Sequence, residues 1–148
     1  MQLTQFTDYS LRTLMYLSYR DRSSPVTISE IAEQFQLPRN HLVKVVNKLG
    51  KLGWIDATRG RNGGLRLAVL PEHLTLGQIL QGVEQSTELI DCEKSYCRLR
   101  GGCKLKDILD QGLKRFYQHM SEYTLADLVD KPTGTKIEDM HRIWTSTE

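Results

Sequence analysis

The chain has 148 residues, 20 of them lysine or arginine and 18 aspartate or glutamate, so its formal net charge is only +2. This length suits one domain or a small head with an extension, and the first residues lack the basic start and apolar core of a secretory signal. No apolar run approaches the roughly 20 residues that span a bilayer, so we expect a cytoplasmic protein with no membrane partner.

Residues 1–70 are predicted to form a winged helix-turn-helix DNA-binding domain. Apolar residues at helical spacing predict a first helix over residues 4–20. Thr27 and Glu30 have the spacing of a capping box and begin a second helix that ends near Gln36. Pro38 suits the first turn of a third helix, which buries a stripe formed by Leu42, Val45, Val46 and Leu49 and ends near Leu52.

A short hairpin follows this third helix and is typical of a wing. Gly53 closes the helix, and residues 54–58 and 65–69 have the composition and alternation of two short strands. The turn between them, residues 59–64, is rich in arginine and glycine. The fold class is therefore predicted to be mainly α, with a small β-hairpin wing and a long dimerisation helix farther along the chain.

Positive charge is concentrated in the first half of the chain. Residues 1–70 carry ten lysines or arginines against five acids, whereas residues 71–148 carry ten against thirteen. The alternative, that these charges only solvate a surface, leaves their coincidence with a helix-turn-helix and a wing unexplained. Residues at the start of the third helix suit base edges, later lysines suit phosphates, and wing arginines suit a minor groove. The predicted DNA-binding residues are Arg39, Asn40, His41, Lys44, Lys48, Lys51, Arg59, Arg61 and Asn62.

The second half is predicted to hold a sensor loop and a dimerisation element. Residues 71–103 are expected to form a connecting helix, capped by Thr75, and a cysteine-rich loop. Residues 104–130 are expected to form a long dimerisation helix and a short terminal helix. Residues 131–148, with one proline, one glycine and scattered charges, are expected to be a flexible tail. An apolar stripe over four turns of the long helix favours pairing with a second copy and consists of Leu105, Ile108, Leu109, Leu113, Phe116, Tyr117 and Met120.

All three cysteines of the chain lie within twelve residues. Four residues separate Cys92 from Cys97, and five separate Cys97 from Cys103. An odd number of cysteines in a reducing compartment argues against a disulfide framework, so metal ligation or redox chemistry is their leading use. Thiolates suit an iron–sulfur cluster or zinc, and structural zinc sites prefer closer pairs and four ligands, which favours the cluster. A thiol switch and unliganded cysteines are the other readings.

Several motifs together resemble the NsrR group of bacterial winged-helix regulators, repressors that sense nitric oxide through an iron–sulfur cluster. The resemblance covers residues 1–129. In the related regulators of iron–sulfur cluster assembly, five residues separate the first two cysteines and a histidine soon follows the third, and this chain has neither feature. The matching segments are LTQFTDY at 3–9, RNHLVK at 39–44, RGRNGGLRL at 59–67 and YTLADLV at 123–129, together with the three spaced cysteines.

This resemblance implies a homodimer with one 4Fe–4S cluster per subunit, or alternatively a 2Fe–2S cluster. Cys92, Cys97 and Cys103 are the implied cysteine ligands. The implied fourth ligand is Asp8 of the other subunit, although Asp8 alone reads as an acid at a helix start. A carboxylate matches iron less well than a thiolate, so the iron it binds should be the reactive one.

The implied function is that of a transcriptional repressor rather than an enzyme. The homodimer would bind a pseudo-palindromic site in double-stranded promoter DNA while its cluster is intact. Nitric oxide would attack the cluster and release the DNA, which would control nitrosative-stress genes. The rival readings are a regulator of iron–sulfur assembly or redox state, a cluster-bearing electron carrier, and a zinc-stabilised DNA-binding module.

Overall fold

In the computed structural model, which describes residues 2–84, 88–94 and 96–147, the chain is mainly α-helical with one two-stranded antiparallel hairpin. No helix in these described ranges is long and apolar enough to cross a bilayer. The elements are α1 (Gln5–Leu17), α2 (Ile28–Phe35), α3 (Arg39–Lys51), β1 (Ile55–Thr58), β2 (Gly64–Leu67), the 3₁₀ turn η1 (Pro71–His73), α4 (Leu76–Val83), α5 (Lys104–Met120), α6 (Leu125–Leu128) and α7 (Thr133–Ser146).

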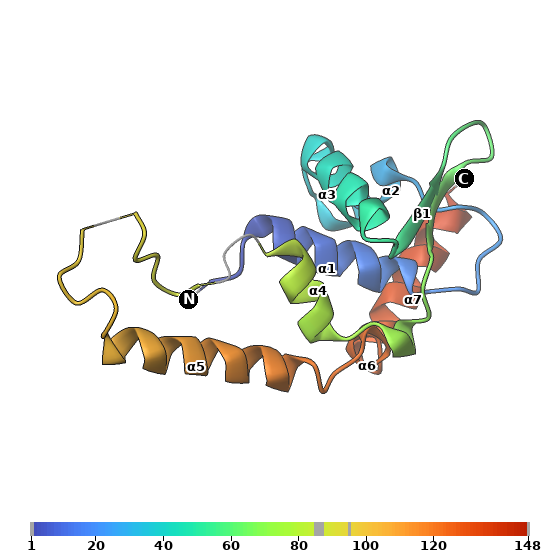
Figure 1. Ribbon diagram of the computed structural model, residues 1–148. Coiled ribbons are helices and arrows are strands. Elements are labelled where there is room, and N and C mark those ends of the chain that lie inside the picture. The colour runs from blue at the N-terminus through green and yellow to red at the C-terminus, as the bar shows by residue number, and fades with distance from the viewer. Residues whose placement is uncertain (1, 85–87, 95, 148) are drawn as a thin grey trace.

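The molecule has two parts. Most elements gather into one body, which we call the head (residues 2–84 and 121–147), and α5 extends along one side of it (Figure 1). The residues before α5, which we call the cysteine segment (described residues 88–103), lie at the far end of this extension (Figure 1). Along the chain, the helix-turn-helix and the hairpin come first, and the cysteine segment and α5 follow.

Local signals form the helix-turn-helix. The Thr27 hydroxyl accepts a hydrogen bond from the Glu30 amide at 3.1 Å, and the Glu30 carboxylate accepts one from the Thr27 amide at 3.4 Å, which completes the predicted capping box. Gln36 ends α2 in the left-handed conformation, with a φ of 51°. Pro38 lies just before α3 as its N-cap residue rather than inside its first turn. The buried residues of α3 are the four predicted ones, Leu42, Val45, Val46 and Leu49.

The wing is fastened to the rest of the head through β2. β1 and β2 pair from Ile55 opposite Leu67 to Thr58 opposite Gly64, so both strands are shorter than predicted. On the other edge of β2, the amide of residue 65 donates to the carbonyl of Val26 at 2.7 Å. Glycine is required at position 64, because a Cβ there would lie 2.7 Å from the same Val26 oxygen.

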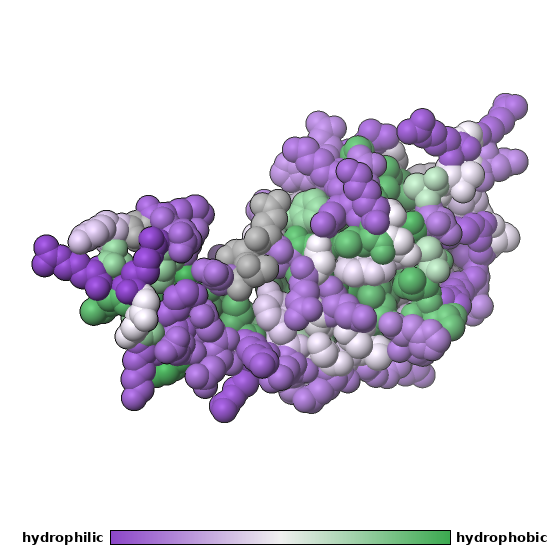
Figure 2. Space-filling model, viewed as in Figure 1, coloured by the Kyte–Doolittle hydropathy of each residue, from purple (hydrophilic) through white to green (hydrophobic). Residues whose placement is uncertain are grey.

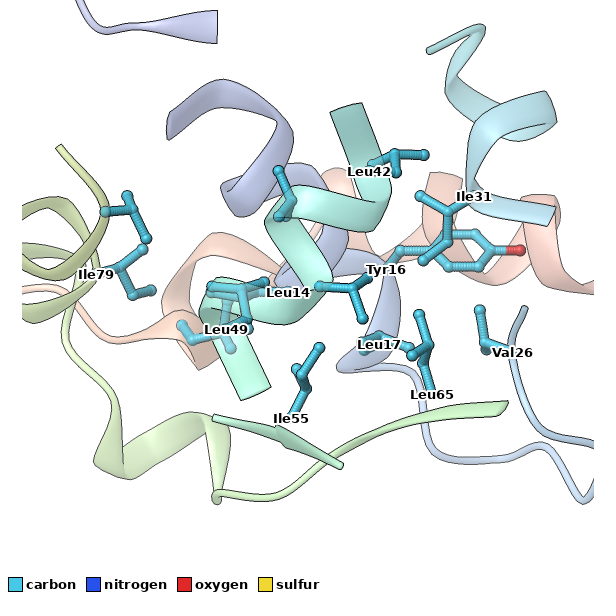
Figure 3. Close-up of a cluster of buried hydrophobic side chains, with 14 of the residues drawn as sticks. Leu14, Tyr16, Leu17, Val26, Ile31, Leu42, Leu49, Ile55, Leu65 and Ile79 are labelled. Atoms are coloured by element: carbon cyan, nitrogen blue, oxygen red, sulfur yellow. The ribbon is translucent and has the colours of Figure 1, made fainter. Parts of the chain in front are cut away.

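A single hydrophobic core joins α1, α3, the wing and α4. Leu14 of α1, Leu49 of α3 and Ile79 of α4 are each fully buried in it. Figure 3 shows these side chains together with those of Ile55 and Leu65, which the wing contributes. Burial of side chains this large contributes about 1.5–3 kcal/mol each, so the core holds the recognition helix and the wing in a fixed relation.

The C-terminal end of α5 is held by α4. Gly77 of α4 has no side chain, and a Cβ there would lie 2.0 Å from the Ser121 Oγ and 2.9 Å from the Tyr117 carbonyl oxygen. The amide of Leu76 donates to the Tyr123 carbonyl at 2.8 Å. Because α4 also packs against α1, it links the extension to the head.

The prediction of a flexible tail over residues 131–148 is wrong, because α7 occupies most of this range and packs on the head. His141 of α7 is only 1% exposed. The residues that suggested a tail begin the helix instead: Pro132 is its N-cap residue, and Gly134 lies against the Val129 carbonyl, where a Cβ would come within 2.1 Å of the oxygen. The signal that could have predicted α7 is the helical spacing of Ile137, Met140, His141 and Trp144.

Candidate functional site

The exposed face of α3 carries the predicted DNA-binding residues. Its opposite face is buried in the core, so the helix presents only polar and basic side chains to solvent on this side. The Arg39 Nε donates to the Ser29 Oγ of α2 at 3.4 Å, which orients this arginine from the neighbouring helix. Six predicted residues of α3 are exposed, namely Arg39, Asn40, His41, Lys44, Lys48 and Lys51.

The wing tip adds a second cluster of exposed polar residues. Arg59, Arg61 and Asn62 lie in the turn between β1 and β2 and are all exposed. A groove reader needs cations that reach past the body of the protein, and a short hairpin tip supplies them. Which DNA atoms these side chains meet remains a prediction.

The first turns of α1 lie beside the start of α3. A groove of about 670 Å³ is lined from α1 by residues that include Phe6 and Tyr9, and from α3 by His41 and Lys44. The Tyr9 and His41 rings lie with their centroids 6.2 Å apart. A displacement of the start of α1 would therefore change the surroundings of residues that are predicted to contact DNA.

The structure brings the three cysteines together. Cys92, Cys97 and Cys103 line one cavity of about 330 Å³. All three are free thiols of intermediate exposure. The remaining lining residues are Glu93, Arg100, Gly101, Gly102, Lys106 and Asp107.

Backbone contacts fold the cysteine segment around this cavity. The amide of Arg100 donates to the Cys97 carbonyl at 3.3 Å, and its guanidinium donates to the Cys92 carbonyl. Arg100 therefore ties the first cysteine to the turn that follows the second. Gly101 completes the turn with a φ of 88°, a conformation that other residues rarely adopt. Cys103 follows as the N-cap residue of α5.

Two cations and two acids line the cavity beside the thiols, namely Arg100, Lys106, Glu93 and Asp107. Arg100 lines the cavity and pairs with Glu93 at 3.4 Å on the surface. Lys106 also lines the cavity and contacts Asp110 at 2.9 Å. This hydrogen bond raises the pKa of the Lys106 ammonium, and the nearby charges of Glu88 and Cys92 act in the same direction. These cations and the positive end of the α5 dipole favour a negatively charged group in the cavity.

The three thiols are donors of the kind that an iron–sulfur cluster uses. Within the described ranges, no group of three or more histidine, cysteine, aspartate or glutamate side chains is arranged to hold one metal ion. Thiolates are the usual ligands of iron–sulfur clusters. In an iron–sulfur cluster the thiolate ligands bind different iron atoms. Three thiols spaced around one cavity are therefore suitable ligands. The residues of this chain that would hold it are Cys92, Cys97 and Cys103.

Asp8 does not line this cavity. It lies in the first turn of α1, where its carboxylate accepts a hydrogen bond from Arg12 Nε at 3.0 Å and pairs with a second guanidinium nitrogen at 2.9 Å. The Asp8 side chain is 46% exposed, so it is accessible to another molecule. The Arg12 guanidinium carbon also lies 6.0 Å from the Phe35 ring centroid, which connects this ion pair to α2.

Sequence reasoning missed Glu84, which links the cysteine side of the chain to α1. Glu84 ends α4, and its Oε2 accepts hydrogen bonds from the Thr7 hydroxyl and from the amide and hydroxyl of Thr4. Thr4 is the N-cap residue of α1. The Glu84 carboxylate thus adds a negative charge at the positive end of that helix. No local sequence signal could have predicted a contact across 77 positions.

The residues that the structure describes cover the apolar stripe of α5 only in part, least at its N-terminal end. None of the 17 residues of α5 is buried. Leu105 and Ile108 are 59% and 57% exposed, and Leu99 of the cysteine segment is exposed as well. Figure 2 shows hydrophobic side chains at the surface of this extension. Exposed large hydrophobic residues that lie close together are typical of an interaction site.

Comparison with known proteins assigns the sequence to a family. Residues 3–131 match the Rrf2 family, described as iron-dependent transcriptional regulators. The HTH-type transcriptional regulator NsrR of Bacillus licheniformis is 39% identical over 132 residues, which is 87% of this chain and 92% of that protein. The regulator of the same name from Shouchella clausii is 41% identical, over 87% of this chain and 89% of that protein.

Solved structures support the same fold. CymR of B. subtilis, the global cysteine regulator, superposes with a TM-score of 0.68 at 20% identity, covering 86% of this chain and 95% of that one. IscR of T. potens superposes with a TM-score of 0.67 at 22% identity, covering 87% and 86%. The match in sequence and the winged-helix architecture agree, and the relatives are regulators of transcription rather than enzymes. The chain therefore belongs to the Rrf2 family of iron-dependent transcriptional regulators.

Proposed function

We propose that this transcriptional regulator is a nitric-oxide-sensing repressor. It binds promoter DNA as a homodimer that holds one iron–sulfur cluster per subunit. The operator is released when nitric oxide reacts with the cluster. The observation that carries this proposal is the meeting of all three cysteines around one cavity. The similarity to regulators named NsrR supports the assignment of nitric oxide as the signal.

The ligands divide between two places on the chain. Cys92, Cys97 and Cys103 hold the cluster, of 4Fe–4S type, and Asp8 from the second copy is the fourth ligand. When bound, the cluster supplies iron centres that react with nitric oxide. In the free chain Asp8 pairs with Arg12, so the carboxylate has a second partner available whenever it is not a ligand.

Contacts from α1 connect this ligand to the DNA-reading residues. Tyr9, next to Asp8, lies against His41 at the start of α3. Arg12 lies over Phe35 of α2. Glu84, just before the cysteine segment, holds the first turn of α1 through Thr7. Loss of the proposed bond between Asp8 and the cluster therefore shifts α1. Because α2 and α3 pack against α1, the orientation of the recognition helix changes with it.

The partner in DNA binding is a second copy joined along α5. The exposed part of the apolar stripe of α5, with Leu105 and Ile108, supplies the contact surface. A twofold dimer places two recognition helices against half-sites about one DNA turn apart, so the operator is pseudo-palindromic. The contacts at Asp8 and along α5 together set the separation of the two helices.

An anaerobic nitric-oxide titration of the freshly purified protein tests the proposal. Visible absorbance, iron and sulfide content, and binding to a palindromic promoter fragment are followed in the same samples. We expect the iron–sulfur absorbance to bleach in step with the loss of DNA binding. A colourless protein that contains zinc or no metal, and that binds DNA whether or not the gas is present, would show a DNA-binding module without this sensor.

A further inference from the structure

The C-terminal helix α7 inserts a histidine into the polar centre of the head. His141 is 1% exposed. It packs against two aromatic rings, one in α1 and one just after the end of α1. Its ring stacks on Tyr16 with centroids 3.9 Å apart and on Tyr19 with centroids 4.6 Å apart. α7 is also joined to α2, because the Gln34 side chain donates to the Met140 carbonyl at 3.4 Å.

The hydrogen bonds of His141 assign its tautomer. Its Nδ1 lies 3.2 Å from an Arg22 guanidinium nitrogen, and a guanidinium can only donate. The Nδ1 therefore accepts, and the proton of the neutral ring is on Nε2. That nitrogen lies 2.9 Å from the Tyr16 carbonyl oxygen, to which it donates. Both ring nitrogens are satisfied only while the imidazole is neutral.

Four ionisable groups face the imidazole. They are Tyr16 of α1, Tyr19 just after it, Arg22 from the connection to α2, and Glu30 of α2. Glu30 already binds Arg22 through both of its oxygens and accepts a hydrogen bond from the Tyr16 hydroxyl at 2.6 Å. A second proton on His141 would sit on Nδ1 and face the Arg22 cation.

Burial and the Arg22 charge outweigh the attraction of Glu30. Burial is the largest cause that lowers the pKa of His141 below its ordinary value, and the Arg22 charge acts in the same direction. The hydrogen bond to the Tyr16 carbonyl and the Glu30 charge oppose it. Because the folded state has the lower pKa, the stabilisation by neutral His141 is complete above the pKa of the unfolded chain. It is lost as the pH falls through the folded pKa.

We propose that His141 is a proton-operated latch that docks α7 onto α1 and α2. The neutral ring holds α7 against α1 and α2, and protonation releases α7 because Nδ1 loses its lone pair and gains a like charge as neighbour. The regulator thereby carries a sensitivity to acid that is independent of its cysteines. Since α2 carries Glu30 and directly precedes the recognition helix, release of α7 also lowers DNA affinity.

The first test is a histidine titration of the intact chain by nuclear magnetic resonance. We expect His141 to show the Nε2–H tautomer and its pKa to lie below the ordinary range of histidine. Amide exchange in α7 should then become faster relative to that in α4 as His141 is protonated. An Nδ1–H tautomer, or protonation of His141 within the ordinary range of histidine, would overturn the proposal even if no variant folds.

The second test compares His141→Gln with the matched control His73→Gln. Glutamine cannot be protonated but keeps an N–H group that can reach the Tyr16 carbonyl. Free energy of unfolding and affinity for promoter DNA are measured at pH 7.5 and 5.5, under anaerobic conditions. The wild type and His73→Gln should lose several-fold more DNA affinity, and more stability, over this interval than His141→Gln. His41 is present in all three proteins, so its contribution to DNA affinity cancels in the comparison. Equal losses in the three proteins would remove His141 as the latch.

Discussion

The hydroxyl of Thr7 donates a hydrogen bond to the carboxylate of Glu84, although the two residues are 77 positions apart. Thr7 is fully buried in the first turns of α1, and Glu84 is the last residue before the region that carries the cysteines. This contact joins the chain that leads to the candidate cluster site directly to the helix that carries Asp8.

The Thr7–Glu84 contact should have a measurable coupling energy. A double-mutant cycle with Thr7→Val and Glu84→Gln should give about 1–3 kcal/mol, because a charged acceptor strengthens the hydrogen bond to a buried donor. Urea unfolding of the four proteins measures it. In the proposed mechanism, Glu84→Gln should also alter the nitric-oxide dose that releases DNA. Additive single effects would mean that the contact carries no energy.

Asp8→Ala should weaken retention of the cluster while leaving the fold intact. The variant removes a proposed ligand and an exposed ion pair that contributes only about 0–1 kcal/mol. Arg12→Ala is the matched control, because it breaks the same ion pair but keeps the carboxylate. Iron and sulfide per chain are measured after anaerobic purification. If Asp8→Ala keeps its cluster and responds to nitric oxide as the wild type does, Asp8 is not a ligand.

Arg61→Ala should lower DNA affinity by removing a cation of the wing that meets a phosphate or the minor groove. The slope of log affinity against log salt should decrease in magnitude by about 0.9 for each phosphate that the variant no longer neutralises. Arg20→Ala is the control, since Arg20 is exposed but lies just beyond the end of α1, where its guanidinium donates to the Val69 carbonyl. Equal affinity of Arg61→Ala and wild type at every salt concentration would mean that the wing does not touch DNA.

Ile108→Glu should convert the proposed dimer into a monomer. The substitution places a charge in the exposed apolar stripe of α5, where pairing would have to desolvate it. Leu70→Glu is the control, because Leu70 is an exposed leucine of the head (47% exposed) and its replacement should leave the dimer intact. Sedimentation equilibrium gives the molecular mass of each variant in solution. A dimeric Ile108→Glu protein would place the subunit contact elsewhere.

Gly77→Ala should destabilise the protein although alanine is the better helix former. The added methyl would lie 2.9 Å from the Tyr117 carbonyl oxygen and even closer to Ser121, and such overpacking costs about 1–3 kcal/mol. Gly50→Ala in α3 meets only one atom, at 3.9 Å, and should gain up to about 1 kcal/mol from helix propensity. Thermal unfolding separates the two. A stabilised Gly77→Ala protein would show that α4 and α5 can move apart.

The sequence predicts best where the signal is local. The capping box at Thr27 and Glu30, the buried stripe of α3 and the wing all follow from residues a few positions apart, and the structure confirms them. The convergence of the cysteines depends on Arg100 reaching the Cys92 carbonyl, which spacing alone does not specify. The roles of Asp8 as a ligand and of nitric oxide as the signal rest on resemblance, because no spacing within one chain can specify a ligand from a second copy.

The prediction failed where tertiary contacts decide the structure. Pro132 and Gly134 suggested a loose tail because each disfavours a helix interior, yet both stand at a helix start, where they are tolerated. The polar centre formed by Tyr16, Glu30 and His141 spans three helices. Its members are separated by up to 125 positions, so no window of the sequence contains it.

The family match ends at residue 131, yet α7 begins after that point and fills a space inside the head. The stretch that the family model matches therefore does not include all of the residues that pack against α1 and α2. A hybrid that contained residues 3–131 of this chain but not α7 would lack His141. Tyr16, Arg22 and Glu30 would then face the space that this side chain fills. A hybrid regulator built from this chain should carry α7 along with α1 and α2, even though α7 is the farthest of the three from the recognition helix in sequence.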